Sequence, residues 1–124
     1  MQDHPSPQAV LAIAIVHLRD NVLPGLHGRA KFDMRVTIGA LQLVERSLTL
    51  TPASDAAERA RLEALLSETG TLEDLNRMLC VRIREGACDL DTPGLAAHLR
   101  VTAMEKLAVD QPNYSAYRRA LTRS

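Results

Sequence analysis

Apolar residues recur every three or four positions through most of this chain, and polar caps, glycines and prolines interrupt them at intervals. In the clearest stretch, Thr71 and Asp74 are typical of a helix start, and Gly86 favours a helix end. Between them one helix face would carry Leu72, Leu75, Leu79 and Ile83. No stretch alternates between apolar and polar residues for long enough to predict a strand. The pattern therefore predicts an all-α protein.

The same kinds of signal set the other helix boundaries. A hydroxyl residue followed by proline favours a helix start, and this pair occurs at Ser6, Thr51 and Thr92. Helix ends are indicated near Gly25, near Gly70 and at Pro112. We therefore expect a compact bundle of about five helices with short loops and a short C-terminal helix. The expected ranges are about 7–20, 29–50, 52–68, 71–86, 93–111 and 115–121.

The apolar pattern also predicts which surfaces are buried. Residues 9–16 are apolar on all sides, so the first helix should lie between others. The helix over 52–68 is rich in alanine and is expected to be peripheral. Cys80, within a helix, should be buried, whereas Cys88 could be exposed in a loop. Two further helices show an apolar stripe, and on the fifth expected helix it is predicted to face the core: Phe32, Val36, Gly39 and Leu43, and Leu95, Leu99, Ala103 and Leu107.

Length and charge limit the classes of protein to consider. The 124 residues predict one domain over 1–124. Fifteen basic residues balance fifteen acidic ones, and there are only two tyrosines, one phenylalanine and no tryptophan, so a nucleic-acid partner is not expected. The longest apolar run is too short to span a membrane, and the first residues lack the basic start of a signal peptide. We expect a cytoplasmic protein with reduced cysteines.

No recognisable catalytic or metal-binding motif is present. The four histidines, His4, His17, His27 and His98, do not form a pair at helical metal-ligand spacing, and there is no CxxC. The residues also give no sign of a cofactor. We therefore predict no catalytic residues, no metal site and no cofactor, and we lean towards a protein that is not an enzyme.

A small set of polar residues forms a candidate ligand site. Arg35 lies on the apolar stripe of the second expected helix, where a buried guanidinium would need either an internal carboxylate or a ligand anion. His98, Thr102, Lys106 and Asp110 follow one another at successive helical turns. They form either a solvated face or one side of a groove that Tyr114 and Tyr117 would complete. The candidate ligand-binding residues are Arg35, His98, Lys106 and Tyr114.

Several motifs together resemble a known family. These are the VLPGL–GR–F turn, IREG–LD, HLR and the C-terminal KLA–D–P–YSAYRRAL. They are similar to those of small bacterial proteins catalogued only as a domain of unknown function. The family pattern after Arg35 resembles RVAANA, and this chain departs from it by carrying Gly39 in place of the asparagine. The family has no established activity, and the resemblance supplies no catalytic residues.

The resemblance also implies a kind of partner. Members of that family are often encoded near aminoglycoside/choline-kinase-like phosphotransferases and acyl-CoA dehydrogenase-like enzymes. The first hypothesis is therefore a non-enzymatic accessory protein that contacts such an enzyme or forms a homodimer. The alternative is a small-molecule-binding or enzymatic domain with an anion site inside the helical bundle.

Overall fold

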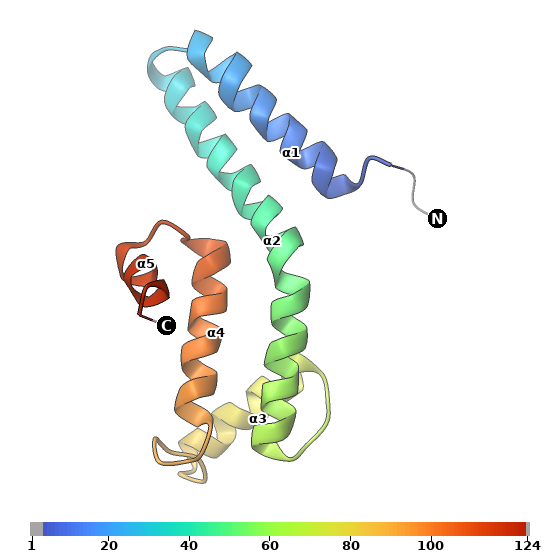
Figure 1. Ribbon diagram of the computed structural model, residues 1–124, viewed down its shortest axis with the longest axis vertical. Coiled ribbons are helices and arrows are strands. Elements are labelled where there is room, and N and C mark those ends of the chain that lie inside the picture. Colours follow the sequence, from blue (N-terminus) through green and yellow to red (C-terminus); the bar gives the residue numbers. More distant parts are fainter. Residues whose placement is uncertain (1–3, 124) are drawn as a thin grey trace. The chain divides into compact units, whose positions relative to one another are not determined.

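The computed structural model describes residues 4–123, and this part of the chain contains five α-helices and no strand (Figure 1). The predicted all-α class, with about five helices and a short helix at the C-terminal end, is confirmed. A π-helical turn, Leu18–Val22, and a 3-10 turn, Leu23–Gly25, separate the first two α-helices. The α-helices are α1 (Pro7–His17), α2 (Gly28–Leu66), α3 (Leu72–Arg84), α4 (Leu95–Asp110) and α5 (Ser115–Leu121).

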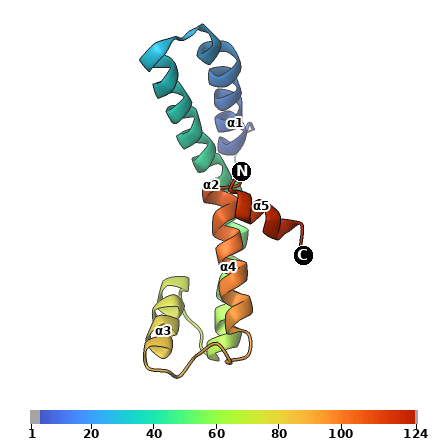
Figure 2. The same ribbon diagram turned by 90° about the vertical axis from the view of Figure 1, so that its left-hand side faces the viewer.

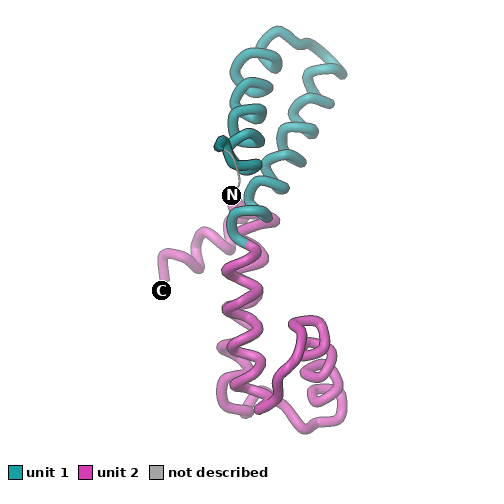
Figure 3. Tube along the Cα trace, turned by 90° about the vertical axis from the view of Figure 1, so that its right-hand side faces the viewer, with its two compact units in different colours: residues 1–50 teal, residues 51–124 magenta. Residues whose placement is uncertain are grey.

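Residue contacts divide the chain into two compact units (Figure 3). Unit 1 covers residues 1–50 and unit 2 covers residues 51–124. Helix α2 supplies its first part to unit 1 and its last part to unit 2. The prediction of a single domain over 1–124 stays a prediction.

The predicted caps explain where several helices begin and end. The Ser6 hydroxyl accepts a hydrogen bond from the Ala9 amide at 3.2 Å at the start of α1. The Thr71 hydroxyl accepts one from the Asp74 amide at 3.1 Å at the start of α3. Gly86 follows the end of α3 with a φ of 76°, a left-handed conformation that glycine adopts without strain.

The predicted helix boundary at Thr51–Pro52 is wrong, because α2 continues through Pro52. Proline already has a φ near the helical value, so it removes one backbone donor and crowds the preceding turn without dictating another conformation. The Thr51–Pro52 pair has the pattern of a helix cap followed by proline at the first helical position. In the structure, α2 has residues 28–51 in helical conformation before the proline.

The start of α4 also differs from the prediction. The helix begins at Leu95, and Gly94 caps it with a φ of 88°. Thr92 instead stabilises the preceding turn, where its hydroxyl accepts a hydrogen bond from the Asp89 amide at 2.9 Å. The Asp89 carboxylate in turn accepts a bond from the Asp91 amide at 2.9 Å. The two aspartates before α4 therefore belong to a structured turn.

In unit 1, α1 and the first part of α2 form a helical hairpin (Figure 2). Its buried large apolar side chains are Ile15 and Ile38. The prediction that α1 is buried on all sides is wrong, since Ile13 is 66% exposed. The stripe on α2 faces outward, with Phe32 at 59% and Val36 at 56% exposure. A hairpin has one buried face per helix, and here Ile38 occupies that face of α2.

Unit 2 contains the main apolar core. The prediction that residues 52–68 are peripheral is wrong, because Leu62 and Leu66 lie at the centre of this core. On α4, Leu95 is buried but Leu99 is 45% exposed, so the inward face is offset from the predicted stripe. The buried cluster consists of Leu62, Leu66, Leu75, Leu79, Cys88 and Leu95, and partly buried Leu65, Leu72 and Met78 pack against it.

The exposure of the two cysteines is the reverse of the prediction. Cys80 is exposed and Cys88 is buried, and both are free thiols. Leu75 and Leu79 occupy the inward face of α3, so the next residue points outward. After Gly86 the chain folds back, and the Cys88 amide donates to the Arg82 carbonyl at 3.1 Å. Among the described residues, no helix is both long enough and apolar enough to cross a membrane.

Candidate functional site

A guanidinium–carboxylate pair joins α2 to α4 within unit 2. Arg61 Nη2 donates to Glu105 Oε2 at 2.6 Å, and Nη1 donates to Oε1 at 3.2 Å. Nη2 also lies 3.3 Å from the Thr102 hydroxyl. The two charged side chains are only 26% and 24% exposed. This two-pronged pairing fixes the guanidinium and largely neutralises its charge.

His98 is the buried histidine beside this pair. It lies in the first turns of α4 and is 4% exposed, and its Nδ1 atom has no hydrogen-bond partner. Burial lowers the pKa of His98 below its usual value, and the positive charge of Arg61 lowers this pKa further. The negative charges of Glu58 and Glu105 oppose the shift without reversing it. The imidazole is therefore neutral at pH 7.

A second buried acid connects α2 to α3. Glu58 is 7% exposed, and its Oε1 atom accepts a hydrogen bond from Asn76 Nδ2 at 2.9 Å. The same amide group also donates to the Leu72 carbonyl at 3.2 Å. Nearby, Arg82 Nη1 donates to the Leu66 carbonyl at 3.1 Å, which satisfies an acceptor at the end of α2. Polar contacts thus hold all three main helices of unit 2.

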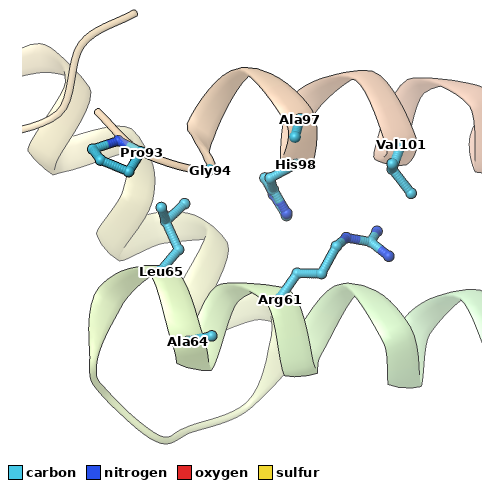
Figure 4. A pocket seen from close by; sticks show the side chains of 8 residues that line it. All are labelled: Arg61, Ala64, Leu65, Pro93, Gly94, Ala97, His98 and Val101. Atoms are coloured by element: carbon cyan, nitrogen blue, oxygen red, sulfur yellow. The ribbon is translucent and has the colours of Figure 1, made fainter. Parts of the chain in front are cut away.

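A cavity of about 330 Å³ opens beside Arg61 and His98 (Figure 4). His98 extends from α4 toward α2, and Arg61 extends from α2 into the space between the helices with its guanidinium group on the Val101 side. The Nε atom of Arg61, like Nδ1 of His98, is buried without a hydrogen-bond partner. The rest of the lining is apolar and consists of Ala64, Leu65, Pro93, Gly94, Ala97 and Val101. The cavity therefore has a largely apolar wall, and the two unpaired nitrogen atoms of its lining residues Arg61 and His98 lie out of reach of a water-sized probe.

Of the four predicted ligand-binding residues, only His98 lines this cavity. Arg35 lies in unit 1 and is exposed, so the premise that it is buried on an apolar face is wrong. Its helix turns the Ile38 side inward instead. Lys106 is exposed, and Tyr114 is 50% exposed at the start of α5. Arg35 belongs to unit 1 and the other three residues to unit 2, and their assignment to one ligand site stays a prediction.

Sequence reasoning missed Arg61 and Glu58. Both lie in the segment that was expected to be peripheral, and both share the inward side of α2 with Leu62. The available signal was their spacing, since Glu58, Arg61, Leu62 and Leu65 follow one another at intervals of three, one and three residues. Charged residues placed among the large apolar residues of an alanine-rich helix indicate paired, partly buried charges.

Metal chemistry gains no support from the arrangement. Within the part of the chain that the structure describes, no group of three or more His, Cys, Asp or Glu side chains could hold a metal ion. The acidic groups nearest His98 are already engaged, Glu105 by Arg61 and Glu58 by Asn76. What the site offers to a ligand is an apolar space with Arg61 and His98 among its lining residues.

Comparison with known proteins gives one match. The model of a family described as "Domain of unknown function (DUF6285)" matches residues 24–114, which is more than half of the chain and includes parts of both units. No curated protein matches the chain, and no solved structure does so. The predicted resemblance to a family of unknown function is confirmed, whereas the bacterial origin and the neighbouring enzymes stay predictions.

Proposed function

This chain belongs to the DUF6285 family of domains of unknown function, and from that premise we propose that it acts by binding another protein through unit 1. One observation carries the proposal. The outward face of α2 in unit 1 presents an apolar stripe, which we call the α2 stripe, formed by Phe32, Val36, Leu43 and Leu50.

The α2 stripe is unusually exposed for side chains of this size. Phe32 and Val36 are more than half exposed, and Leu43 and Leu50 are 39% and 38% exposed. Fully burying one such side chain is worth about 1.5–3 kcal/mol. Single exposed apolar residues are ordinary, whereas these four recur on one helix face, with polar Arg46 and Ser47 between Leu43 and Leu50. The stripe therefore offers substantial binding energy to a partner.

The rest of unit 1 supports the same conclusion. Helix α1 also exposes apolar side chains, with Val10 at 52% and Val16 at 45%. Buried large apolar side chains in the unit are limited to Ile15 and Ile38 among the described residues. A two-helix hairpin with so small a core gains little stability from its own packing. Contact with another protein would supply the missing burial.

A second copy of the chain is the occupant we propose for the stripe. The four residues are separated by four, seven and seven positions, so they remain on one face over a helix length of roughly 27 Å. A two-fold interface uses the same patch on both partners, and a straight apolar helix face can pack against its own copy. Two such hairpins would together form a four-helix arrangement with a shared core.

The charges of α2 do not oppose this pairing. Arg29 pairs with Asp33 at 2.9 Å on the helix surface, and the Arg29 guanidinium lies 5.8 Å from the centre of the Phe32 ring. This is one pair of opposite charges near the start of the stripe, and Arg35 and Arg46 lie beside the stripe farther along α2. An antiparallel arrangement of two copies can place opposite charges together, which favours association.

Light scattering on a sizing column, repeated over a range of protein concentrations, tests the proposal. The parent chain should be a dimer, and Val36→Lys should be a monomer with unchanged helical circular dichroism. Thr37→Lys is the matched control, because Thr37 is the adjacent exposed residue and lies off the stripe. A parent chain that is monomeric at every concentration would refute the homodimer. A dimer that tolerates Val36→Lys would refute the stripe as its interface.

Co-expression distinguishes the second copy from the enzyme partners that the family resemblance implies. The chain would be produced with a phosphotransferase-like or an acyl-CoA dehydrogenase-like enzyme encoded beside it. A monomeric chain that forms a complex with such an enzyme, and loses it on Val36→Lys, would keep the stripe as a docking surface and replace its occupant.

A further inference from the structure

We propose that the cavity beside Arg61 and His98 binds a small neutral molecule with an apolar body and one carbonyl or hydroxyl oxygen. The proposal concerns unit 2 alone and does not depend on the protein contact proposed for unit 1. Three features carry it: the size and lining of the cavity, the two unpaired nitrogen atoms, and the balance of charge around them.

The cavity is of a size that fits a small ligand. Its volume of about 330 Å³ lies at the lower end of the range typical of ligand pockets, which is roughly 300–1,000 Å³. Its wall is formed by apolar side chains on two helices and the turn before α4, including Leu65, Pro93 and Val101. A lining of this kind favours an apolar body and leaves orientation to a few polar groups.

Those polar groups are already in place and lack partners. Arg61 uses Nη1 and Nη2 for Glu105 and Thr102, which leaves its Nε–H without an acceptor. Nδ1 of His98 is also unpaired, and only 4% of the His98 surface is exposed. A buried polar group without a partner is unfavourable and is rare in native proteins. Both atoms are closed to a water-sized probe in this conformation, so a ligand oxygen pairs with them only once the side chains turn toward the cavity.

The chemistry of the two nitrogen atoms defines the oxygen. Arg61 Nε can only donate, whereas Nδ1 of a neutral histidine donates or accepts according to its tautomer. A carbonyl oxygen accepts from both when Nδ1 carries the proton. A hydroxyl accepts a hydrogen bond from Arg61 Nε and donates one to Nδ1 when Nδ1 carries no proton. Either group completes the hydrogen bonding without bringing a charge into the cavity.

The surrounding charges favour a neutral ligand over an anion. Glu105 already compensates Arg61 through two hydrogen bonds, and the buried Glu58 lies close enough to influence the titration of His98. With His98 neutral, the formal charge of these four groups is negative by one unit. A carboxylate or phosphate would therefore meet net repulsion and would have to leave water as well. This separates the cavity from the anion site that was expected around Arg35, His98, Lys106 and Tyr114.

Nitrogen-detected histidine NMR of the full chain, titrated with benzamide, tests the site directly. Benzamide has an apolar ring and a neutral carbonyl group. We expect saturable shifts of the His98 ring nitrogens with a dissociation constant on the order of 1 mM, as is usual for so small a molecule. Benzoate and benzylamine have the same ring with a negative and a positive head group. Benzamide should bind more tightly than benzoate.

A pair of adjacent alanines provides the matched variants. Ala97 lines the cavity, whereas Ala96 is exposed and does not. Ala97→Phe should fill the space and weaken benzamide binding about tenfold or more, and Ala96→Phe should leave it unchanged. Val101→Phe fills the same cavity from the next turn of α4 and replaces Ala97→Phe if that variant fails to fold.

Three results would overturn the proposal. The first is the absence of any saturable His98 shift with benzamide and with benzyl alcohol. The second is benzoate binding as tightly as benzamide. The third is benzamide binding that survives both Ala97→Phe and Val101→Phe. None of these results bears on the dimer of unit 1, so the two proposals fail separately.

Discussion

The two units of this protein are built from the same kind of element and bury very different amounts of apolar surface. Unit 1 has Ile15 and Ile38 as its buried large apolar side chains among the described residues, while the α2 stripe faces outward. Unit 2 gathers six buried apolar residues from three helices and the loop before α4, together with buried Glu58 and His98. Both units have apolar residues at helical spacing, but only in unit 2 do these residues pack together into a core of this size.

An apolar stripe on a helix therefore predicts a contact, but it does not identify whether the contacting surface belongs to the same chain or to another molecule. In unit 2 the partners of Leu62 and Leu66 come from α3 and from the segment that leads into α4. In unit 1 the stripe of Phe32 and Val36 has no such partner within its own hairpin. Stability should therefore reside in unit 2, and association should depend on unit 1. Each prediction below tests one side of this division.

The largest effect is expected from shortening a core leucine of unit 2. Leu62 is completely buried, so Leu62→Ala should lower the free energy of unfolding by about 2–5 kcal/mol through lost contacts and the cavity it leaves. Leu43→Ala, on the exposed stripe of unit 1, should change it by less than about 1 kcal/mol in the monomer. Urea denaturation at low protein concentration measures both. Equal losses would contradict the division between the units.

The next effect compares two arginines, one in each unit. Arg61→Met should destabilise the fold by about 1–3 kcal/mol, because it leaves Glu105 partly buried without its cation. Arg35→Met should change stability by about 0.5 kcal/mol or less, since Arg35 is exposed. Thermal unfolding followed by circular dichroism compares the two. A large loss for Arg35→Met would restore the buried ion pair that the sequence suggested there.

The sequence predicted the class of fold and many of its boundaries because these depend on neighbouring residues. The caps at Ser6 and Thr71 and the glycine stop after α3 are local hydrogen-bond and backbone effects, and the structure confirms them. The orientation of each helix depends on distant residues. Leu99 and Val36 lie on real apolar stripes, yet the neighbouring helix contacts another face in each case.

The candidate site was predicted only in part for the same reason. His98 was identified from its position on a polar stripe, and it does line the cavity. Arg61 and Glu105 are 44 residues apart in sequence, so the spacing within α2 indicates that Arg61 is partly buried but does not identify Glu105 as its partner. The prediction instead chose Arg35, whose apolar neighbours Phe32 and Val36 turned out to be exposed. A stripe on one helix does not reveal which side of it carries a buried charge.

A smaller effect is expected at Pro52, near the point where the two units meet in the sequence. Pro52 lies inside α2 and is exposed, and it cannot donate a hydrogen bond to the Leu48 carbonyl. Pro52→Ala should therefore stabilise the protein by about 1–2 kcal/mol, after allowing for the greater freedom of the unfolded chain. Pro7→Ala should give no such gain, because Pro7 occupies the first turn of α1. Destabilisation by Pro52→Ala would favour the helix break that the sequence suggested.

The smallest expected effect is a change of the free energy of unfolding with pH, and it should originate in unit 2. Burial and Arg61 lower the folded-state pKa of His98 below the ordinary histidine value, so the unfolded chain binds the proton more readily. The stabilisation is present above the ordinary histidine pKa and is lost as the pH falls through that value toward the lowered one. Urea denaturation at a series of pH values should show this decline in the parent chain and a flatter profile in His98→Gln. His27→Gln, which changes an exposed histidine of unit 1, should keep the parent profile, whereas an unchanged slope in His98→Gln would place the titrating group elsewhere.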